Sequence, residues 1–174
     1  NLLGEYQREN ASLVRQAIDL LRPLLPVTPD HVEKGLQNIK WPGRLEPIKI
    51  IHQSTIWFDI AHNPASAEAV STFFKERTKS NTLIFCLLKS KNALETLRPL
   101  LKIFGQIIFF TPLEKDRYHS PKTLAHLSKN LKKDVTVTPS LKEAIERALK
   151  ESPDDILVAG SHSIAPNLKD ILTE

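Results

Sequence analysis

From residue 47 onward, short apolar runs alternate with stretches of helical period, and this alternation constrains the fold more than any other feature. The predicted strands are Pro47–Ile51, Thr55–Ala61, Thr82–Leu88, Gln106–Thr111, Asp134–Thr138 and Asp155–Ala159. The predicted helices are Pro64 to about Thr78, Ala93–Phe104, Pro121–Leu131, Leu141–Lys150 and a last helix ending at Leu172. The first two strands are close enough for a hairpin. The rest predicts an α/β fold, with a mostly parallel sheet of about six strands and helices on both faces.

The first forty residues show no strand pattern. Two helical stretches, Asn10–Leu21 and Pro29–Gln37, flank the proline-bearing segment Arg22–Pro26. We therefore expect a short helical segment ahead of the sheet, and we place the boundary between the two parts after residue 38.

The predicted strand Thr55–Ala61 runs almost directly into a helix start. Asn63 is a favoured N-cap residue and Pro64 a favoured first helical residue, so Asp59 and His62 fall at the strand-to-helix turn. Open α/β sheets bind ligands at this edge, where strand carboxyl ends meet the free N–H groups of helix N-termini. The sequence therefore predicts a ligand site near Asp59 and His62.

Each of these two residues has a structural alternative. Asp59 lies inside an apolar run, where a carboxylate is costly to bury unless it meets hydrogen-bond donors. A ribose diol or ordered backbone N–H groups would supply the donors, and the alternative is an aspartate that bonds only the N–H groups of its own turn. His62 would bind a phosphate or substrate oxygen, or else be an ordinary loop histidine.

An arginine precedes Asp59 by fifteen residues, in the segment Trp41-Pro42-Gly43-Arg44-Leu45-Glu46. The guanidinium donates paired hydrogen bonds to phosphate oxygens and keeps its charge near neutral pH. Arg44, on a turn containing glycine, is thus a candidate phosphate ligand. The alternative for Arg44 is an ion pair with Glu46 or the capping of a helix.

Further polar segments follow other predicted strands. They are Lys89-Ser90-Lys91-Asn92, Arg117-Tyr118-His119 and Gly160-Ser161-His162-Ser163. All three fall on the same predicted edge as Asp59 and have positions suited to ligand contact. Solvent exposure explains the first two equally well, and an N-cap role explains Ser161 or Ser163.

Composition argues against several functional classes. The net charge is +4 and the pI about 9.2, yet the basic residues are spread over most helices, so we expect no nucleic-acid partner. No apolar run approaches the roughly 18 residues that span a membrane, and we expect a cytoplasmic protein without membrane contact. Cys86, the only cysteine, lies in an apolar strand and is expected in the core. The histidines lack paired ligand spacing, which predicts no metal site.

The segments Trp41–Glu46 and Asp59–Pro64 resemble the carboxy-terminal part of the folylpolyglutamate synthase and dihydrofolate synthase family, among the Mur ligases. Gly4–Ala11 resembles the segment that closes the ATP-binding domain of those enzymes, with Tyr6 where histidine is usual. The resemblance implies a Rossmann-like carboxy-terminal domain over residues 39–174. It also implies that residues 1–38 are the helical end of the central ATPase domain.

The same resemblance implies roles for individual residues. Arg44 would bind nucleotide, Asp59 and Asn10 would contact ATP, and His62 would act at a phosphate or substrate oxygen. The family joins L-glutamate to dihydropteroate or folate by way of an acyl phosphate, using ATP and Mg²⁺. The magnesium ligands and the phosphate loop lie in an amino-terminal domain, which would be a partner of this one.

Two observations limit the resemblance. The chain contains no G-x-x-x-x-G-K-[ST] phosphate loop, so it is expected to be inactive in isolation. Lys89–Asn92 stands where the family commonly has an acidic segment, which leaves the amino-acid contacts open. The alternatives are a ligase for peptidoglycan precursors, or a non-catalytic module of the same fold that binds a nucleotide or a protein.

Overall fold

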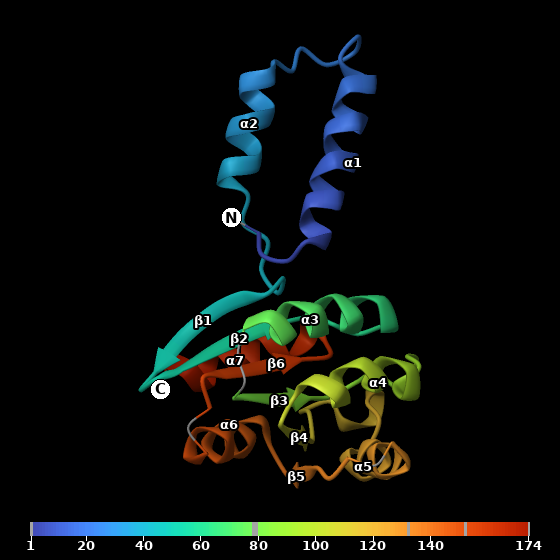
Figure 1. The fold of residues 1–174 in the computed structure, drawn as a ribbon, viewed down its shortest axis with the longest axis vertical. Coiled ribbons are helices and arrows are strands. Elements are labelled where there is room, and N and C mark those ends of the chain that lie inside the picture. Colours follow the sequence, from blue (N-terminus) through green and yellow to red (C-terminus); the bar gives the residue numbers. More distant parts are fainter. Residues whose placement is uncertain (1, 78–79, 132, 152, 174) are drawn as a thin grey trace.

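Six strands form a single sheet in the computed structural model, which describes residues 2–77, 80–131, 133–151 and 153–173 (Figure 1). The strand order is β1-β2-β6-β3-β4-β5. The bounds are β1 Glu46–Ile51, β2 Ser54–Asp59, β3 Asn81–Phe85, β4 Gln106–Phe110, β5 Thr136–Thr138 and β6 Asp155–Ala159. β1 pairs antiparallel with β2, and the other pairings of these strands are parallel. The predicted hairpin and six-stranded, mostly parallel sheet are confirmed.

Helices cover both faces of the sheet, as the alternating pattern predicts. The bounds are α3 Pro64–Arg77, α4 Ala93–Ile103, α5 Pro121–Asn130, α6 Leu141–Lys150 and α7 Ala165–Thr173. In β3, Leu83 and Phe85 pack in the cluster with α3, α4 and α5, whereas Ile84, and Cys86 just after the strand, pack in the cluster with α6 and α7. This alternation follows from the two-residue period of a strand. Both faces of β3 are thus buried.

Cys86 and Gly160 meet where β3 and β6 end. The Cys86 side chain is fully buried, and burial raises the pKa of its thiol, so the predicted core role is confirmed. Gly160 has a φ of +112°, and a Cβ at this position would lie 1.7 Å from the Cys86 carbonyl oxygen. Only glycine permits this approach, which brings the loop after β6 against the end of β3.

Two strands end earlier than predicted because residues just beyond them form other hydrogen bonds. β2 ends at Asp59, since the Ala61 N–H donates to the Asp59 carboxylate. β3 ends at Phe85, since the Leu87 carbonyl accepts from the His119 N–H. Both departures thus reflect hydrogen bonding at the edge of the sheet where ligand contacts are predicted.

Two element starts also differ from prediction. β5 begins at Thr136 rather than Asp134, which is exposed at the edge of the sheet. α1 begins at Tyr6 rather than Asn10, because helical hydrogen bonding already starts at the Gly4 carbonyl. The predicted end of α3 at Thr78 lies outside the described residues, and the other described ends fall within one residue of prediction.

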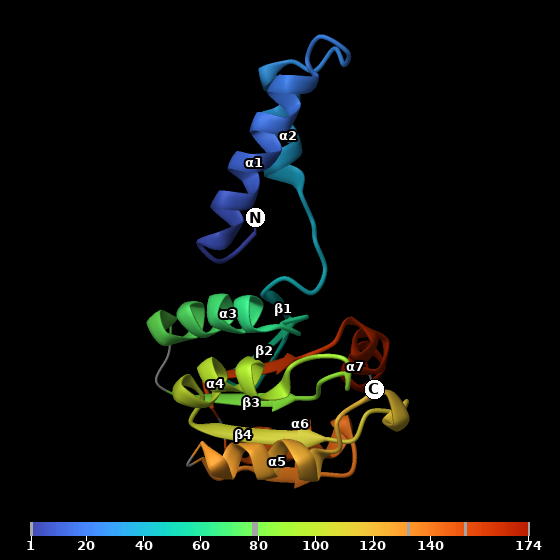
Figure 2. The ribbon, with the colours of Figure 1, turned by 90° about the vertical axis from the view of Figure 1, so that its right-hand side faces the viewer.

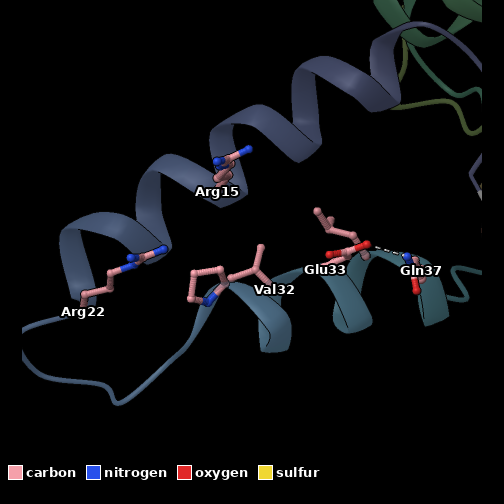
Figure 3. A pocket seen from close by; sticks show the side chains of 7 residues that line it. Arg15, Arg22, Val32, Glu33 and Gln37 are labelled. Atoms are coloured by element: carbon pink, nitrogen blue, oxygen red, sulfur yellow. Dashed lines mark hydrogen bonds between the residues drawn. The ribbon is translucent and has the colours of Figure 1, made fainter.

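The helices α1 (Tyr6–Leu21) and α2 (Pro29–Asn38) stand away from the sheet as a pair (Figures 1 and 2). Several of their apolar side chains face solvent, including Leu13 at 64% exposure and Leu20 at 82%. A groove of about 530 Å³ separates the two helices (Figure 3). It is lined by Arg15, Arg22, Pro29, Val32, Glu33, Leu36 and Gln37. Among the described residues, no helix combines the length and apolarity needed to cross a membrane.

Candidate functional site

A cleft of about 330 Å³ lies between the start of α1, the turn before β1 and the start of α3; we call it the α1–α3 cleft. It is lined by Tyr6, Gln7, Asn10, Trp41, Arg44, Asp59, Asn63, Ala65, Ser66 and Ala69. The three residues expected to contact nucleotide, Asn10, Arg44 and Asp59, come from three separate elements and line this one cleft. His62 is absent from the lining, although its neighbour Asn63 belongs to it.

Asp59 connects two backbone segments at the wall of this cleft. Its carboxylate accepts one hydrogen bond from the Leu45 N–H and one from the Ala61 N–H, both at 2.8 Å, and the residue is only 1% exposed. Burial raises the pKa of the Asp59 carboxyl, against the lowering effect of the two hydrogen bonds and of Arg44. Both oxygens thus have backbone partners, which favours the structural alternative for Asp59. Its contact with a nucleotide stays a prediction.

The turn that carries Arg44 has an unusual backbone. Gly43 has a φ of +74° and Leu45 a φ of +44°, a left-handed conformation that costs a non-glycine residue roughly 1–2 kcal/mol. The bond from Leu45 to Asp59 and a 2.8 Å bond from the Gly43 N–H to the Glu46 carboxylate hold the turn in this shape. Arg44, between these two left-handed residues, lies in the lining of the cleft.

The Arg44 side chain is half-buried in that cleft. Within the described residues it forms no ion pair, and Glu46 bonds instead to the Gly43 backbone, so the alternative of an Arg44–Glu46 pair does not hold. The cleft therefore presents a guanidinium whose donors are available to an anion.

Helix α1 contributes polar groups that sequence reasoning assigned no role. Gln7 is 8% exposed and accepts a 3.1 Å hydrogen bond from the Asn10 amide. The pKa of the Tyr6 hydroxyl is raised, because burial and the negative charge of Asp59 outweigh the lowering effect of a bond with Gln7 and of the charge of Arg44. The available signal was spacing, since Tyr6 and Gln7 lie four and three residues before Asn10 on one helical face.

Helix α3 points its N-terminus at the same cleft. The Asn63 side chain accepts from the Ser66 N–H at 2.9 Å, while the Ser66 hydroxyl accepts from the Asn63 N–H at 3.2 Å. The predicted N-cap at Asn63 is thereby confirmed, with Pro64 as first helical residue. The N-terminus of a fourteen-residue helix adds partial positive charge beside Arg44.

His62 lies beside the cleft with an unused ring nitrogen. Within the described structure its Nδ1 is buried and has no hydrogen-bond partner. Burial and the nearby charges of Lys91 and Arg44 lower the pKa of His62, so the ring is neutral at pH 7. A loop histidine that serves structure alone would be expected to bond that nitrogen.

Comparison with known proteins identifies the family. The sequence model of the Mur ligase, glutamate ligase domain matches residues 43–162. This chain belongs to that family. Its matched region includes Arg44, Asp59 and His62, whereas Asn10 lies ahead of it.

Similar proteins fall into two groups of ligases. A probable dihydrofolate synthetase of Schizosaccharomyces pombe is 30% identical over 105 residues, covering 58% of this chain and 25% of that protein. A UDP-N-acetylmuramyl-tripeptide synthetase of Lactococcus lactis is 27% identical over 181 residues, covering 97% of this chain and 36% of that protein. This chain spans from about a sixth to about two fifths of the length of such relatives.

Solved structures give the same fold. A folylpolyglutamate synthase of Thermotoga maritima superposes with a TM-score of 0.73 at 27% identity, covering 98% of this chain and 39% of that one. A folylpolyglutamate synthase of Mycobacterium tuberculosis complexed with ADP gives 0.86 at 22% identity, covering 99% and 41%. At its lower identity, the second match supports the fold alone.

Two further loops meet on the edge of this glutamate ligase domain. The Tyr118 hydroxyl bonds to the Ser161 hydroxyl at 3.0 Å and also contacts Ser163, and the two serines bond to each other at 3.0 Å. Ser161 is 4% exposed and makes no capping bond, so the N-cap explanation for it is wrong. The predicted loop segments after β4 and β6 are thus joined through side chains.

The glutamate ligase domain offers no described group suited to a divalent metal. No three His, Cys, Asp or Glu side chains gather closely enough among the described residues to hold an ion. No step below depends on a metal held by this chain.

Proposed function

We propose that this glutamate ligase domain is the carboxy-terminal part of an ATP-dependent amide ligase that joins L-glutamate to folate or dihydropteroate. The main support is the α1–α3 cleft, where Arg44, Asn10 and the N-terminus of α3 converge. Related folylpolyglutamate synthases have been solved with ADP and AMPPCP, and related bifunctional enzymes with AMPPNP and L-glutamate. ATP as substrate also fits the cytoplasmic location expected from sequence.

In this proposal the α1–α3 cleft holds ATP. The Arg44 guanidinium bonds phosphate oxygens and neutralises charge that builds up on the γ-phosphoryl group during transfer. Asn10 bonds the nucleoside side. Asp59 contributes by fixing the Leu45 backbone, and hence the direction of Arg44, through the 2.8 Å bond at the cleft wall. A cleft of about 330 Å³ suits part of a nucleotide and leaves the rest to another surface.

The chemistry proceeds in two displacements. A carboxylate oxygen of the folate substrate attacks the γ-phosphorus, and ADP leaves. The amine of glutamate then attacks the acyl carbon, inorganic phosphate leaves and the amine releases a proton. His62 supplies a neutral ring with a free Nδ1 beside Arg44, and we place it at a phosphate or substrate oxygen.

The remaining parts of the site belong to an amino-terminal ATPase domain in this proposal. That domain would supply the phosphate loop and the magnesium ligands, and it would close over ATP from the side opposite Arg44. Residues 1–38 would be the end of that domain, and residues 39–174 the carboxy-terminal one. Exposed leucines on α1, such as Leu13 and Leu20, are consistent with a face that packs against it.

A second candidate function is ligation of a peptidoglycan precursor. Its support is that the tripeptide synthetase of L. lactis matches over 97% of this chain, whereas the S. pombe dihydrofolate synthetase matches over 58%. A non-catalytic binding module is the third possibility. The three differ in which acceptor, if any, stimulates ATP cleavage.

The decisive assay measures ADP release by the full-length parent protein with glutamate and either dihydropteroate or tetrahydrofolate as acceptor. A UDP-linked muramyl dipeptide with lysine is the parallel acceptor. We expect release only with the folate-type acceptors. Release only with the muramyl acceptor would establish the second function, and ATP binding without release in any mixture would establish the third.

Arg44→Ala in that assay tests the site itself. The variant should raise the KM for ATP by about tenfold or more, since a charged hydrogen bond contributes roughly 1.5–3 kcal/mol. Lys102→Ala, an exposed cation at the opposite edge of the sheet, is the matched control. Equal kinetics in the two variants would remove Arg44 from the site.

A further inference from the structure

The helical pair and the α/β part meet at the first turn of α1. Figures 1 and 2 show the pair standing clear of the sheet, with the start of α1 as the end of that helix nearest to the sheet. The chain also connects the two parts through residues 39–45, between the end of α2 and the start of β1. The α1–α3 cleft is lined from both parts, by Asn10 of α1 and by Arg44 of the turn. The width of the cleft therefore depends on how the two parts are held together.

Tyr6, the first residue of α1, fills the space where the two parts approach each other. Its ring lies so close to Gly4 that a Cβ on Gly4 would stand 2.6 Å from the ring carbon Cε1. The same Cβ would stand 3.1 Å from Cδ1 of Leu45, so the ring and this methyl group meet at Gly4. Tyr6 is half-buried and packs against the apolar cluster that contains Leu45. An aromatic side chain of the helical pair is thus seated on the α/β part.

The α/β side of this contact leads directly to Arg44. Leu45 is 1% exposed, and its N–H donates to the Asp59 carboxylate at 2.8 Å. Its side chain therefore meets the helical pair while its backbone is fixed to the sheet. Arg44 is the residue before it and lines the cleft. Without the Tyr6 ring, the turn that carries Arg44 would no longer be held against α1.

The helical side of the contact leads to Asn10. The Tyr6 hydroxyl bonds with the side chain of Gln7, which is 8% exposed. The Gln7 side chain in turn accepts a 3.1 Å hydrogen bond from the Asn10 amide. Tyr6 and Asn10 are four residues apart and therefore share one face of α1. A series of side-chain bonds thus runs from Tyr6 through Gln7 to Asn10.

Tyr6 also lines the cleft, so direct contact with a nucleotide is the alternative. Its contacts favour an indirect role, because the ring already packs with Gly4 and Leu45 and the hydroxyl already bonds with Gln7. A side chain that fixes two ligand-binding groups before the ligand arrives lowers the ordering cost of binding. Tyr6 is placed to do this for groups on opposite walls of the cleft.

We propose that Tyr6 is a positioning residue of the nucleotide site, whose ring sets the spacing between the Asn10 amide and the Arg44 guanidinium. The inference rests on the proposed function, because it requires that ATP occupies the α1–α3 cleft. Asn10 belongs to the helical pair and Arg44 to the α/β part, so neither residue fixes the position of the other. Without the Tyr6 ring both groups remain, but ATP must bring them to one spacing as it binds.

The test measures the dissociation constant of the full-length parent protein for ATP by calorimetry. Tyr6→Ala should bind ATP about tenfold more weakly, because the cost of ordering the cleft then falls on binding. Tyr6→Phe keeps the ring and should stay within about threefold of the unmodified protein. The matched control is Arg8→Ala, which removes an exposed side chain from the same turn of α1 and should change binding by less than about twofold. Unfolding of a variant would lower the binding stoichiometry and leave the dissociation constant unchanged, so a folding defect is recognised.

A double-mutant cycle separates positioning from direct contact. If Tyr6 acts through Arg44, the losses in Tyr6→Ala and Arg44→Ala are less than additive, and the double variant should bind at least about threefold more tightly than their product predicts. Additive losses would overturn the proposal, since they would show that Tyr6 contacts ATP independently of Arg44. Equal binding by Tyr6→Ala and Arg8→Ala, or Tyr6→Phe as weak as Tyr6→Ala, would also overturn it.

A measurement without ATP keeps this inference distinct from the proposed function. In the 174-residue chain, a nuclear Overhauser effect should connect the ring protons of Tyr6 with a methyl group of Leu45. Its absence would overturn the positioning role, whatever binds in the cleft. If the effect is present and Arg44→Ala leaves ATP binding unchanged, the proposed nucleotide site is wrong and the role of Tyr6 at that site fails with it. If Arg44→Ala weakens binding and Tyr6→Ala does not, the positioning role alone is wrong.

Discussion

Leu97 in α4 is fully buried, whereas Leu20 in α1 is 82% exposed, although both are leucines of amphipathic helices. The difference is one of partners, because α4 packs on a sheet and on α3 while α1 and α2 leave a groove between them (Figure 3). The α/β part therefore carries its own core. The helical pair leaves several apolar side chains uncovered by the described residues.

Glycine substitutions should give the largest difference in the free energy of unfolding between the α/β part and the helical pair. Gly160→Ala places a Cβ 1.7 Å from the Cys86 carbonyl at a φ of +112°, so we expect a loss of about 5 kcal/mol or more, among the largest for single substitutions. Gly35→Ala in α2 meets no atom within 4 Å and should stabilise the helix by roughly 0.5–1 kcal/mol. Urea unfolding measures both. Similar effects at the two positions would contradict the structure where β3 and β6 end.

Core truncations should give the next largest difference. Phe74→Ala removes a fully buried ring that contacts Trp57 and Phe104, and the expected cost is about 3–5 kcal/mol. Leu20→Ala should change the free energy of unfolding by less than about 0.5 kcal/mol, since the side chain is already in water. The comparison is made by denaturant unfolding of the isolated chain. A large loss at Leu20 would show that α1 packs more tightly than it does here.

Periodicity was sufficient to predict most of the sheet and helices. Leu141–Lys150 has the predicted bounds because its apolar spacing, N-cap and length agree. Element ends were wrong at two strands for different reasons. The Ala61 N–H bonds to the side chain of Asp59, two residues away, and the Leu87 carbonyl bonds to His119, which is remote in sequence. Local pattern carries no information on such remote pairs.

The candidate site was predictable only in part for the same reason. The edge of the sheet followed from strand direction, and the family motifs indicated Asn10, Arg44 and Asp59. The bond between Asp59 and Leu45 joins residues fourteen apart and depends on a left-handed turn. The burial of Gln7 does not follow from sequence, because a glutamine near a helix start is ordinarily exposed.

Asp59 links the Arg44 turn to the sheet, and its titration should be visible in stability. Burial raises the pKa of Asp59 in the folded state. The stability that the protonated carboxyl contributes is therefore fully present below the ordinary value of 3.8 and is lost as pH rises through the raised pKa. The side chain of Asp59→Asn does not ionise, so the variant does not lose this stability. Its free energy of unfolding should therefore rise relative to that of the unmodified chain as pH increases through this window. Denaturant unfolding at pH 3.5 to 7 measures the difference. If the difference in free energy of unfolding between the two chains did not change with pH, the burial of this carboxyl would be contradicted.

The smallest effect is expected at His62, between the two parts of the molecule. Burial and the charges of Lys91 and Arg44 lower the pKa of His62 in the folded state. The stability that the neutral ring contributes is therefore present above the ordinary value of 6.5 and is lost as pH falls through the lowered pKa. An anion bound beside Arg44 would offset these charges and raise the pKa of His62. NMR titration of the ring with and without ATP measures this shift, and inorganic phosphate gives the comparison. If ATP left the His62 titration unchanged in a full-length parent that binds ATP, the α1–α3 cleft would lose its assignment as a nucleotide site, because the pKa of this ring responds to the charge near Arg44.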